Sequence, residues 1–206
     1  LTVSQQVLLW TDLDLWAINY VGDVANGLIF GQNKIGASCG AVGAHAVGQL
    51  NSTIFWMGRS NFFVLAGGGV QPLPCTVWDV VFQDLDVDNI HKVRACPNTP
   101  FNEIIWEYPS LSGGTGENDS YVCFNLVEQT WDYGPLARSA WIDQSVLGMP
   151  IGASPQGIVY QHEVSENADG QPLNWSFTTG YTTIGQGEDF GFVDLIIPDF
   201  KYGTFN

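Results

Sequence analysis

The sequence predicts an all-β protein that forms a β-propeller, or part of one, from blades of about four antiparallel strands. Short stretches of aromatic and β-branched residues alternate with turns of Gly, Asn and Ser, which is typical of antiparallel hairpins. Trp10, Trp56 and Trp106 lie 46 and 50 positions apart, and Tyr160 follows 54 positions later. Propeller blades repeat at similar intervals of roughly 40–50 residues. The alternative is an ordinary β-sandwich with aromatic-rich strands.

Four hairpins carry this repeat. In the clearest one, IFWMGRSNFFVL, residues 54–57 and 62–65 form two strands around a polar turn, and three glycines at 67–69 then redirect the chain. Similar hairpins are expected at residues 7–20, 103–125 and 151–163. Residues 118–136 have the pattern of the last two strands of a kelch-type blade, in which an aromatic strand and a turn precede a Trp and a Gly.

One segment, residues 76–94, has a helical pattern and is expected to be a short insertion between strands. Thr76 is placed to cap this helix, with Asp79 three residues later as the acid of a capping box. Apolar residues at helical spacing predict one buried face. They are Val77, Val80, Val81 and Leu85. A second short helix is expected to carry Ile90 and Val93.

The charge balance argues against one class of function. The 206 residues carry 21 acidic and 6 basic side chains, a net charge of −15. Tight binding to nucleic acid needs Lys and Arg to replace counterions, so sequence-specific DNA binding is not expected, although DNA could slide past such a surface. Only 13% of the residues are charged, which leaves uncharged surface for partner subunits to bury. No signal peptide and no apolar run of about 18 residues is present, so membrane insertion is not expected.

No catalytic, cofactor-binding or metal-binding residue is predicted, and no cofactor is expected. Asp84, Asp86 and Asp88 resemble the start of a calcium loop, but Asn89 and Ala95 stand where that loop needs Gly and Glu. A solvated helix end explains these acids better.

The cysteines and one histidine are expected to be structural. Cysteines occur at four positions without zinc-type spacing, and buried free thiols are predicted. They are Cys39, Cys75, Cys96 and Cys123. His45 lies in the small-residue segment IGASCGAVGAHAVGQL, which lacks a phosphate-binding motif.

An enzyme that cleaves glycans is the competing class, and it needs two carboxylates at a defined separation. The candidate acids are Asp12, Asp14, Glu103, Glu107, Asp132 and Asp143, which the sequence does not pair. Ser139 and Ser145 lack the context of a nucleophilic serine. The chain has three arginines, which are too scattered to suggest a cluster that binds acidic sugars: Arg59, Arg94 and Arg138. Arg59 is expected in a hairpin turn, and Arg138 is expected to form an ion pair at a strand edge. The chain is therefore predicted not to be an enzyme.

Eight stretches, in order, resemble the tail accessory, or packaged-DNA stabilisation, proteins of short-tailed bacteriophages. They are WTDLDLWAINYVG, FWMGRSNFFV, PLPCTVWDVVFQDL, IIWEYPS, ENDSYVCFNLVEQTW, LARSAWID, HEV and GFVDLIIPDF, within a resemblance that extends over residues 7–200. The resemblance implies a virion structural protein of the tail nozzle or hub below the portal, in a family whose related nozzle proteins contain a β-propeller. It supplies no catalytic residue.

The resemblance also implies partners and a location. Such proteins form rings that close the tail channel, retain packaged DNA and let it pass at ejection. We therefore expect a ring of copies, a hexamer by resemblance, beside portal, adaptor and other tail proteins. The ring would assemble in the host cytoplasm and reside in the virion. The alternative function is a propeller of the tail that binds a host receptor or degrades glycans.

The chain is expected to divide near residue 165. Residues 1–165 would form about three or four blades, and residues 166–206 a β segment that leads to a platform or further strands. Because such tail proteins are longer, the chain is expected to be part of a longer polypeptide.

Overall fold

The chain divides into two compact units, Leu1–Ser165 and Glu166–Asn206. The computed structural model describes residues 1–3, 6–23, 26–144, 146, 148–165, 167, 168, 170–176, 178, 180, 192, 194, 195 and 197. Most of the described elements are strands in small antiparallel sheets, which confirms the all-β prediction.

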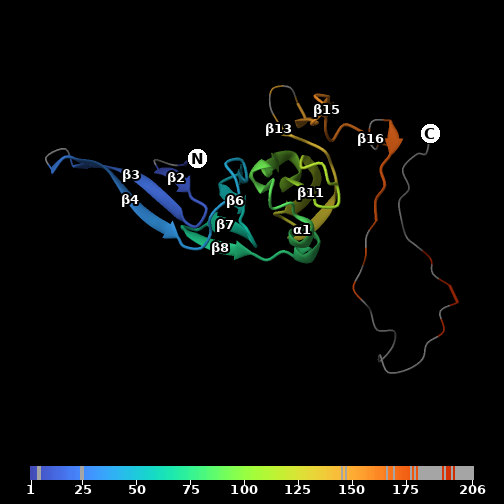
Figure 1. Ribbon diagram of the computed structural model, residues 1–206, viewed down its shortest axis with the longest axis horizontal. Coiled ribbons are helices and arrows are strands. Elements are labelled where there is room, and N and C mark those ends of the chain that lie inside the picture. The colour runs from blue at the N-terminus through green and yellow to red at the C-terminus, as the bar shows by residue number, and fades with distance from the viewer. Residues whose placement is uncertain are drawn as a thin grey trace. The chain divides into compact units, whose positions relative to one another are not determined.

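The first unit contains four antiparallel sheets, in each of which neighbouring strands follow chain order (Figure 1). The first sheet comprises β1 (Thr2–Val3), β2 (Gln6–Trp10), β3 (Leu15–Asp23) and β4 (Leu28–Gly36). The second comprises β5 (Val47–Leu50), β6 (Thr53–Met57), β7 (Phe62–Ala66) and β8 (Gly69–Leu73). The third comprises β9 (Arg94–Asn98), β10 (Glu103–Pro109), β11 (Asn118–Asn125) and β12 (Thr130–Pro135). The fourth comprises β13 (Ala140–Ile142), β14 (Ile151–Ala153) and β15 (Val159–Gln161). No sheet closes on itself within the described residues.

The four predicted hairpins are present, as β2–β3, β6–β7, β10–β11 and β14–β15. A further tight turn joins β7 to β8 through Gly67 and Gly68, whose φ angles are 60° and 85°. Glycine adopts this left-handed region without strain, which explains why the glycine triplet redirects the chain. β4 was not predicted, because Gly31, Asn33 and Gly36 interrupt its apolar residues and have weak strand propensity. Its pairing with β3 maintains it.

The second and third sheets are buried on both faces, because successive residues of a strand point to opposite sides. In β6, Ile54 and Trp56 pack against the first sheet, whereas Phe55 and Met57 pack against the third. The first strands of the second, third and fourth sheets also adjoin, β5 beside β9 and β9 beside β13, whereas the first and second sheets adjoin at their last strands, β4 and β8. The first unit is therefore a series of sheets packed face to face.

Two of the repeated aromatic residues are equivalent. Trp56 and Trp106 are fully buried in the second strand of their sheets and face the preceding sheet. The Nε1 of Trp56 donates to the backbone oxygen of Cys39 at 2.7 Å, and that of Trp106 to Ala46 at 3.1 Å. Trp10 differs, since it faces the following sheet and packs edge-to-face on Trp56.

The last member of the repeat also differs, because Tyr160 lies in the third strand of its sheet, not the second. The spacing of 46 and 50 residues therefore reflects the number of residues that one sheet and its connections occupy. Only Trp56 and Trp106 have the same position and direction in their sheets.

The helical insertion is confirmed, as α1 (Trp78–Asp84) and the 3₁₀ helix η2 (Ile90–Lys92). The capping box was wrong, because Val77 occupies the N-cap position and no side chain caps the helix, so Thr76 lies one residue too early. The expected apolar face was only partly right. Val81 and Leu85 are buried, but Val80 is 40% exposed.

The second unit contains a short hairpin of β16 (Asn167–Ala168) and β17 (Gln171–Pro172). Residues 173–176 are described and form no strand. Residues 181–191 and most of the stretch GFVDLIIPDF lie outside the described residues.

We predict that Trp56→Ala and Trp106→Ala each lower the free energy of unfolding by about 3–5 kcal/mol, because each removes a fully buried ring and leaves a backbone oxygen unpaired. Denaturant titration of the purified variants measures this. Trp78→Ala is the matched control. Because Trp78 is 38% exposed, its replacement should lower the free energy of unfolding by less. A loss below about 1 kcal/mol at both positions would contradict their shared role as buried anchors of the repeat.

Candidate functional site

The outward face of the first sheet is mostly apolar and partly exposed. Strand register places six apolar side chains there, and we call them the open face. They are Val7, Leu9, Trp16, Ile18, Tyr20 and Phe30. Leu9 is 50% exposed and Phe30 63%. The opposite face of the sheet, which carries Leu8 and Leu15, is buried against the second sheet.

Sequence reasoning overlooked the open face, although a signal was present. The runs VLLW and LWAI in β2 and β3 are apolar at consecutive positions, and such runs are typical of strands covered on both faces. Alternating polar residues would be expected if one side of the sheet faced water. The first sheet therefore has the composition of an inner sheet but the exposure of an outer one.

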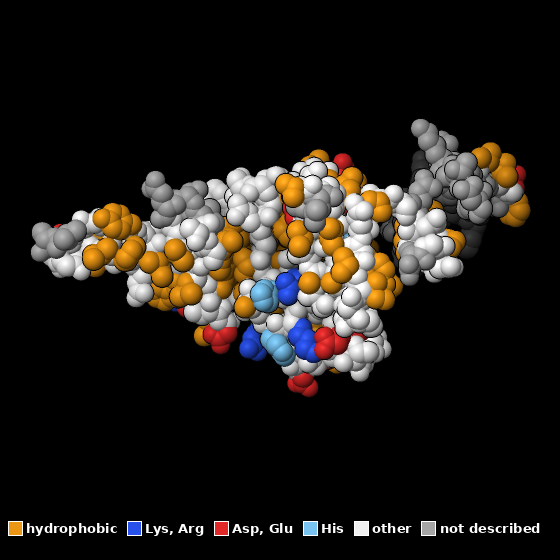
Figure 2. Space-filling view, turned by 90° about the horizontal axis from the view of Figure 1, so that it is seen from above, with side chains coloured by type: hydrophobic (Ala, Val, Ile, Leu, Met, Phe, Trp, Pro, Cys, Tyr) orange, Lys and Arg blue, Asp and Glu red, His pale blue; other side chains and the backbone are white. Residues whose placement is uncertain are grey.

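β3 and β4 extend beyond β2 as a two-stranded hairpin. Asn19, opposite Gln6, is the last residue of β3 that pairs with β2, whereas β3 continues to Asp23. On this extension Tyr20 and Phe30 pack edge-to-face, with ring centroids 5.8 Å apart. Figure 2 shows hydrophobic side chains gathered over this end of the first unit. Because two-stranded hairpins alone are marginally stable in water, the extension is suited to packing against a partner.

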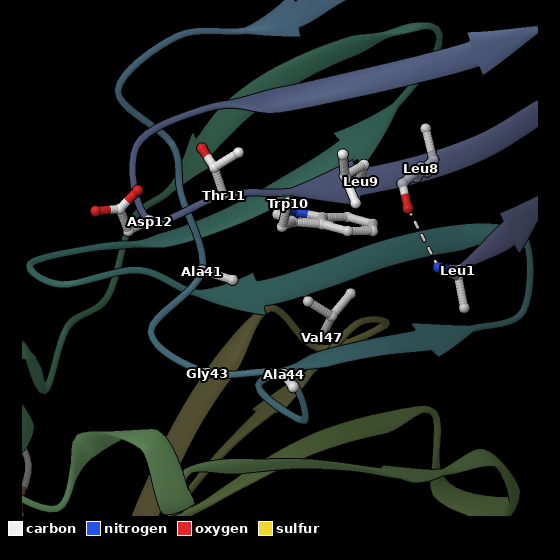
Figure 3. A pocket seen from close by; sticks show the side chains of 10 residues that line it. All are labelled: Leu1, Leu8, Leu9, Trp10, Thr11, Asp12, Ala41, Gly43, Ala44 and Val47. Carbon is white, nitrogen blue, oxygen red and sulfur yellow. Dashed lines mark hydrogen bonds between the residues drawn. The ribbon is translucent and has the colours of Figure 1, made fainter.

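A hollow of about 490 Å³ lies beside the edge of β2 (Figure 3). Its lining residues are Leu1, Leu8, Leu9, Trp10, Thr11, Asp12, Ala41, Gly43, Ala44 and Val47. The Nε1 of Trp10 is buried and has no hydrogen-bond partner among the described residues. An apolar group fits this hollow better than a charged substrate, because its walls are mostly apolar.

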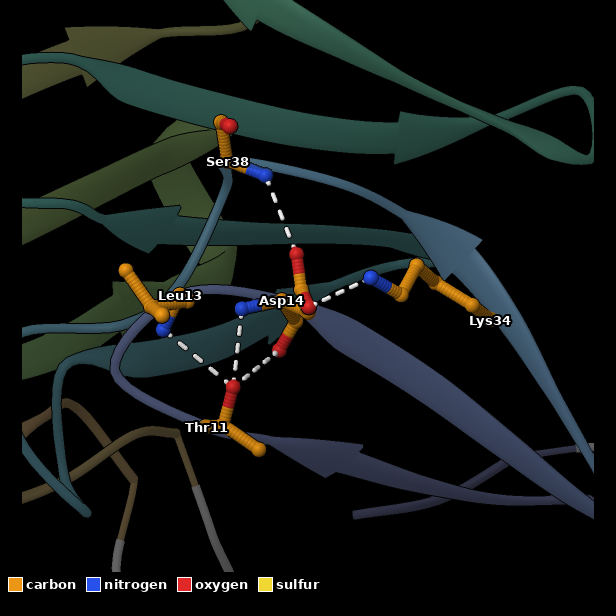
Figure 4. Close-up of polar contacts among 5 residues, drawn as sticks. All are labelled: Thr11, Leu13, Asp14, Lys34 and Ser38. Carbon is orange, nitrogen blue, oxygen red and sulfur yellow. Dashed lines mark hydrogen bonds and ion pairs between the residues drawn. The ribbon is translucent and has the colours of Figure 1, made fainter.

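Three of the candidate acids are structural or exposed. The Asp14 carboxylate accepts hydrogen bonds from Lys34 Nζ at 2.6 Å and from the Ser38 amide (Figure 4). These bonds, led by that from Lys34, lower the pKa of Asp14. The Asp143 carboxylate accepts hydrogen bonds from the amide and hydroxyl of Thr99. Asp12 is exposed at the hollow.

The other three candidate acids lie on one face of the third sheet, toward the fourth. Register places Glu103, Glu107 and Asp132 on the same side as Ile105. Glu107 is fully buried, which excludes it from contact with a substrate. Glu103 accepts a hydrogen bond from the Asn98 amide at 2.9 Å. The alternation in EIIWEYP could have shown from sequence that both glutamates share a face.

Glu107 is the most perturbed acid of this interface. Neither of its carboxylate oxygens has a hydrogen-bond partner among the described residues. Burial raises its pKa to about 7, while the Cys96 thiol and the positive charges of Arg138 and Arg94 prevent a larger rise. The carboxyl is therefore protonated in a substantial fraction of molecules near neutral pH.

Within the described part of the chain, Arg138 does not form the predicted ion pair. Its guanidinium donates from Nε to His162 Nε2 at 2.9 Å and stacks 4.1 Å from the ring centroid of Tyr160. These contacts hold it between the third and fourth sheets instead of at a solvated edge. Burial, and secondarily the Arg138 charge, lowers the pKa of His162 to about 4, so this imidazole is neutral and can accept the hydrogen bond.

The remaining candidates have structural surroundings. All four cysteines are free, and Cys39, Cys96 and Cys123 are buried, as predicted, while Cys75 is half-buried. Asp84 accepts hydrogen bonds from the amide and hydroxyl of Ser112. Three further positions fall in turns or strand edges. Arg59 and His45 are exposed in turns, and the Ser139 hydroxyl donates to the Ala153 oxygen.

Of two further candidates, one lies outside the described residues and the other takes part in local hydrogen bonds. Ser145 lies outside the described residues, and Asp86 accepts hydrogen bonds from Asn89 Nδ2 and the Asp88 amide. No group of three His, Cys, Asp or Glu side chains is arranged to hold a metal in the described part of the chain.

The described residues contain no helix that is long and apolar enough to cross a membrane. No protein-family model matches the chain, and no curated protein is significantly similar to it.

We predict that Glu107→Gln changes the pH dependence of stability. The folded state raises the pKa of Glu107 from 4.5 to about 7, so its stabilising contribution is complete below pH 4.5 and is lost as pH rises through 7. Relative to the wild-type protein, the variant should therefore gain up to about 3 kcal/mol between pH 4.5 and pH 8. The shifted pKa of His162 affects both proteins equally.

Denaturant titrations at several pH values measure this difference. Glu117→Gln removes one surface carboxylate, 2.7 Å from Lys92 Nζ, and controls for the loss of a negative charge. A stability difference that stays constant across the range would show that folding does not perturb Glu107.

Proposed function

We propose that the chain is a structural subunit that assembles with copies of itself by packing its sheets face to face. The open face is the observation that carries this proposal. Its six apolar side chains are contiguous by register, and four of them are more than 40% exposed. Large apolar patches on soluble proteins usually mark contacts with other proteins.

The proposed architecture is part of a β-propeller with kelch-like blades. Three successive four-stranded sheets and one three-stranded sheet, each in chain order, support it. The adjoining first strands of the second, third and fourth sheets support it further, because the first strand of each blade lines the axis of a propeller. The open face would then be the side of a blade that still needs a neighbour.

The proposed assembly is the short tail of a bacteriophage, with the chain in the nozzle or hub below the portal. The ordered motifs from WTDLDLWAINYVG to GFVDLIIPDF support this assignment. The net charge of −15 supports it as well, since an acidic ring would repel phosphates and let DNA pass without being held. In this proposal the ring closes the channel in the virion, retains packaged DNA and contacts portal, adaptor and other tail proteins.

The non-enzymatic part of the proposal is supported by the environment of the candidate acids. A glycan hydrolase needs two carboxylates that reach its substrate. Glu107 is inaccessible, Asp14 is held by Lys34, and Asp143 is held by Thr99. The second candidate function is receptor binding, which the exposed aromatic pair Tyr20 and Phe30 favours. The tryptophans buried between sheets favour the structural role.

The mass and shape of the purified particle test this proposal. We expect light scattering to give several copies per particle and negative-stain microscopy to show a ring with an open centre. A monomer at all accessible concentrations would contradict assembly from copies. Glycan binding by such a monomer, lost on changing Tyr20 and Phe30 to Ala, would instead favour receptor binding.

A further inference from the structure

We infer that the open face of the first sheet binds the outward face of the fourth sheet of a second copy. This inference rests on the proposed assembly from copies and identifies the two surfaces that meet. It follows from the composition of the two end sheets, from the packing repeated inside the chain, and from the position of the charges.

The fourth sheet also has one covered and one exposed face. Trp141 and Tyr160 lie on the covered side, where Trp141 Nε1 donates to the Pro97 oxygen of the third sheet at 2.7 Å. The side chains of alternate register point away from the third sheet. They are Ala140, Ile142, Ile151, Ala153, Val159 and Gln161. Ile142 is 57% exposed and Val159 67%, so this face is apolar too.

Packing inside the chain shows how such faces meet. The first sheet packs on the second and the second on the third through apolar side chains from alternate strand positions. A series of sheets packed this way has one unsatisfied face at each end. Because the two end faces are different surfaces, their contact between copies is head-to-tail and generates a closed ring or a filament.

The charges favour a second copy of this acidic chain as the occupant. Two molecules of net charge −15 can approach closely only where carboxylates are absent or neutralised. The outward face of the first sheet carries one basic side chain beside the open face, Lys34, which register places opposite Trp16 and whose Nζ lies 5.4 Å from the Trp16 ring centroid. The outward residues of the fourth sheet include no charged residue. At the margin of the open face, Asp14 is paired with Lys34 at 2.6 Å.

The test uses one lysine on each face. Leu9→Lys alters the open face and Val159→Lys alters the fourth sheet, and both side chains are at least half exposed, so the fold should tolerate them. Val127→Lys is the matched control, at a 66% exposed valine in the turn between β11 and β12. Circular dichroism confirms folding, and analytical ultracentrifugation measures association.

Each face variant alone should self-associate on the order of 100-fold more weakly than the wild-type protein, because a buried ammonium without a partner is unfavourable. An equal mixture of the two should form 1:1 dimers, since each variant keeps the one intact face that the other lacks. The control should assemble like the wild-type protein.

Four results would overturn the inference. Wild-type-like assembly of both variants would place the contact elsewhere and leave the proposed function intact. Loss of assembly with Leu9→Lys alone would indicate that open faces pair with each other. Failure of the mixture to form dimers would exclude the head-to-tail contact. A wild-type protein that stays monomeric would overturn both the inference and the proposed assembly.

Discussion

The packing of aromatic rings between the second and third sheets is the interaction on which the rest of the structure depends. Phe62 of β7 lies 4.6 Å from Trp106 of β10 and 4.9 Å from Trp131 of β12, measured between ring centroids. Phe82 of α1 contacts the same Phe62 ring at 5.3 Å, so the helical insertion closes over the cluster. Aromatic pairs contribute about 0.5–1.5 kcal/mol each beyond the area that they bury. The cluster therefore joins strands from two sheets and one helix into a single core.

The interfaces on either side of this core differ in chemistry. The contact of the first and second sheets is apolar and includes the stacked rings of Trp56 and Phe63, 5.6 Å apart. The contact of the third and fourth sheets instead contains Glu107, Arg138 and His162. The free energy of burying such polar groups depends on whether they are protonated. Near neutral pH, the free energy of unfolding should therefore change with pH mainly through the contact of the third and fourth sheets.

Much of the fold could be predicted from sequence, because hairpin strands and turns have local signatures. The β6–β7 hairpin and the insertion at residues 76–94 were located correctly. The face to which a side chain points was harder, because a register change of one residue reverses it. Trp10 and Trp56 look equivalent by spacing but point in opposite directions along the series of sheets. The burial of Glu107 depends on the fourth sheet, which lies more than thirty residues later in the chain.

The open face was missed for a different reason. It exists because no neighbouring sheet packs on that side within the described residues, and the sequences of the strands do not encode this. A sheet with inner composition and outer exposure is recognised only after its neighbours have been placed. The phage assignment rests on ordered motifs, and the open face supports assembly of whatever kind, so the two arguments are independent. Together they support the proposal of an acidic subunit whose mostly apolar end surfaces contact its copies.

Electron cryomicroscopy of the assembled particle tests the central claim most directly. The account predicts that Leu9 and Trp16 of one copy lie in van der Waals contact with the fourth sheet of the next, around Ile142 and Val159. An assembled particle in which the open face of every copy remains exposed to solvent would contradict it.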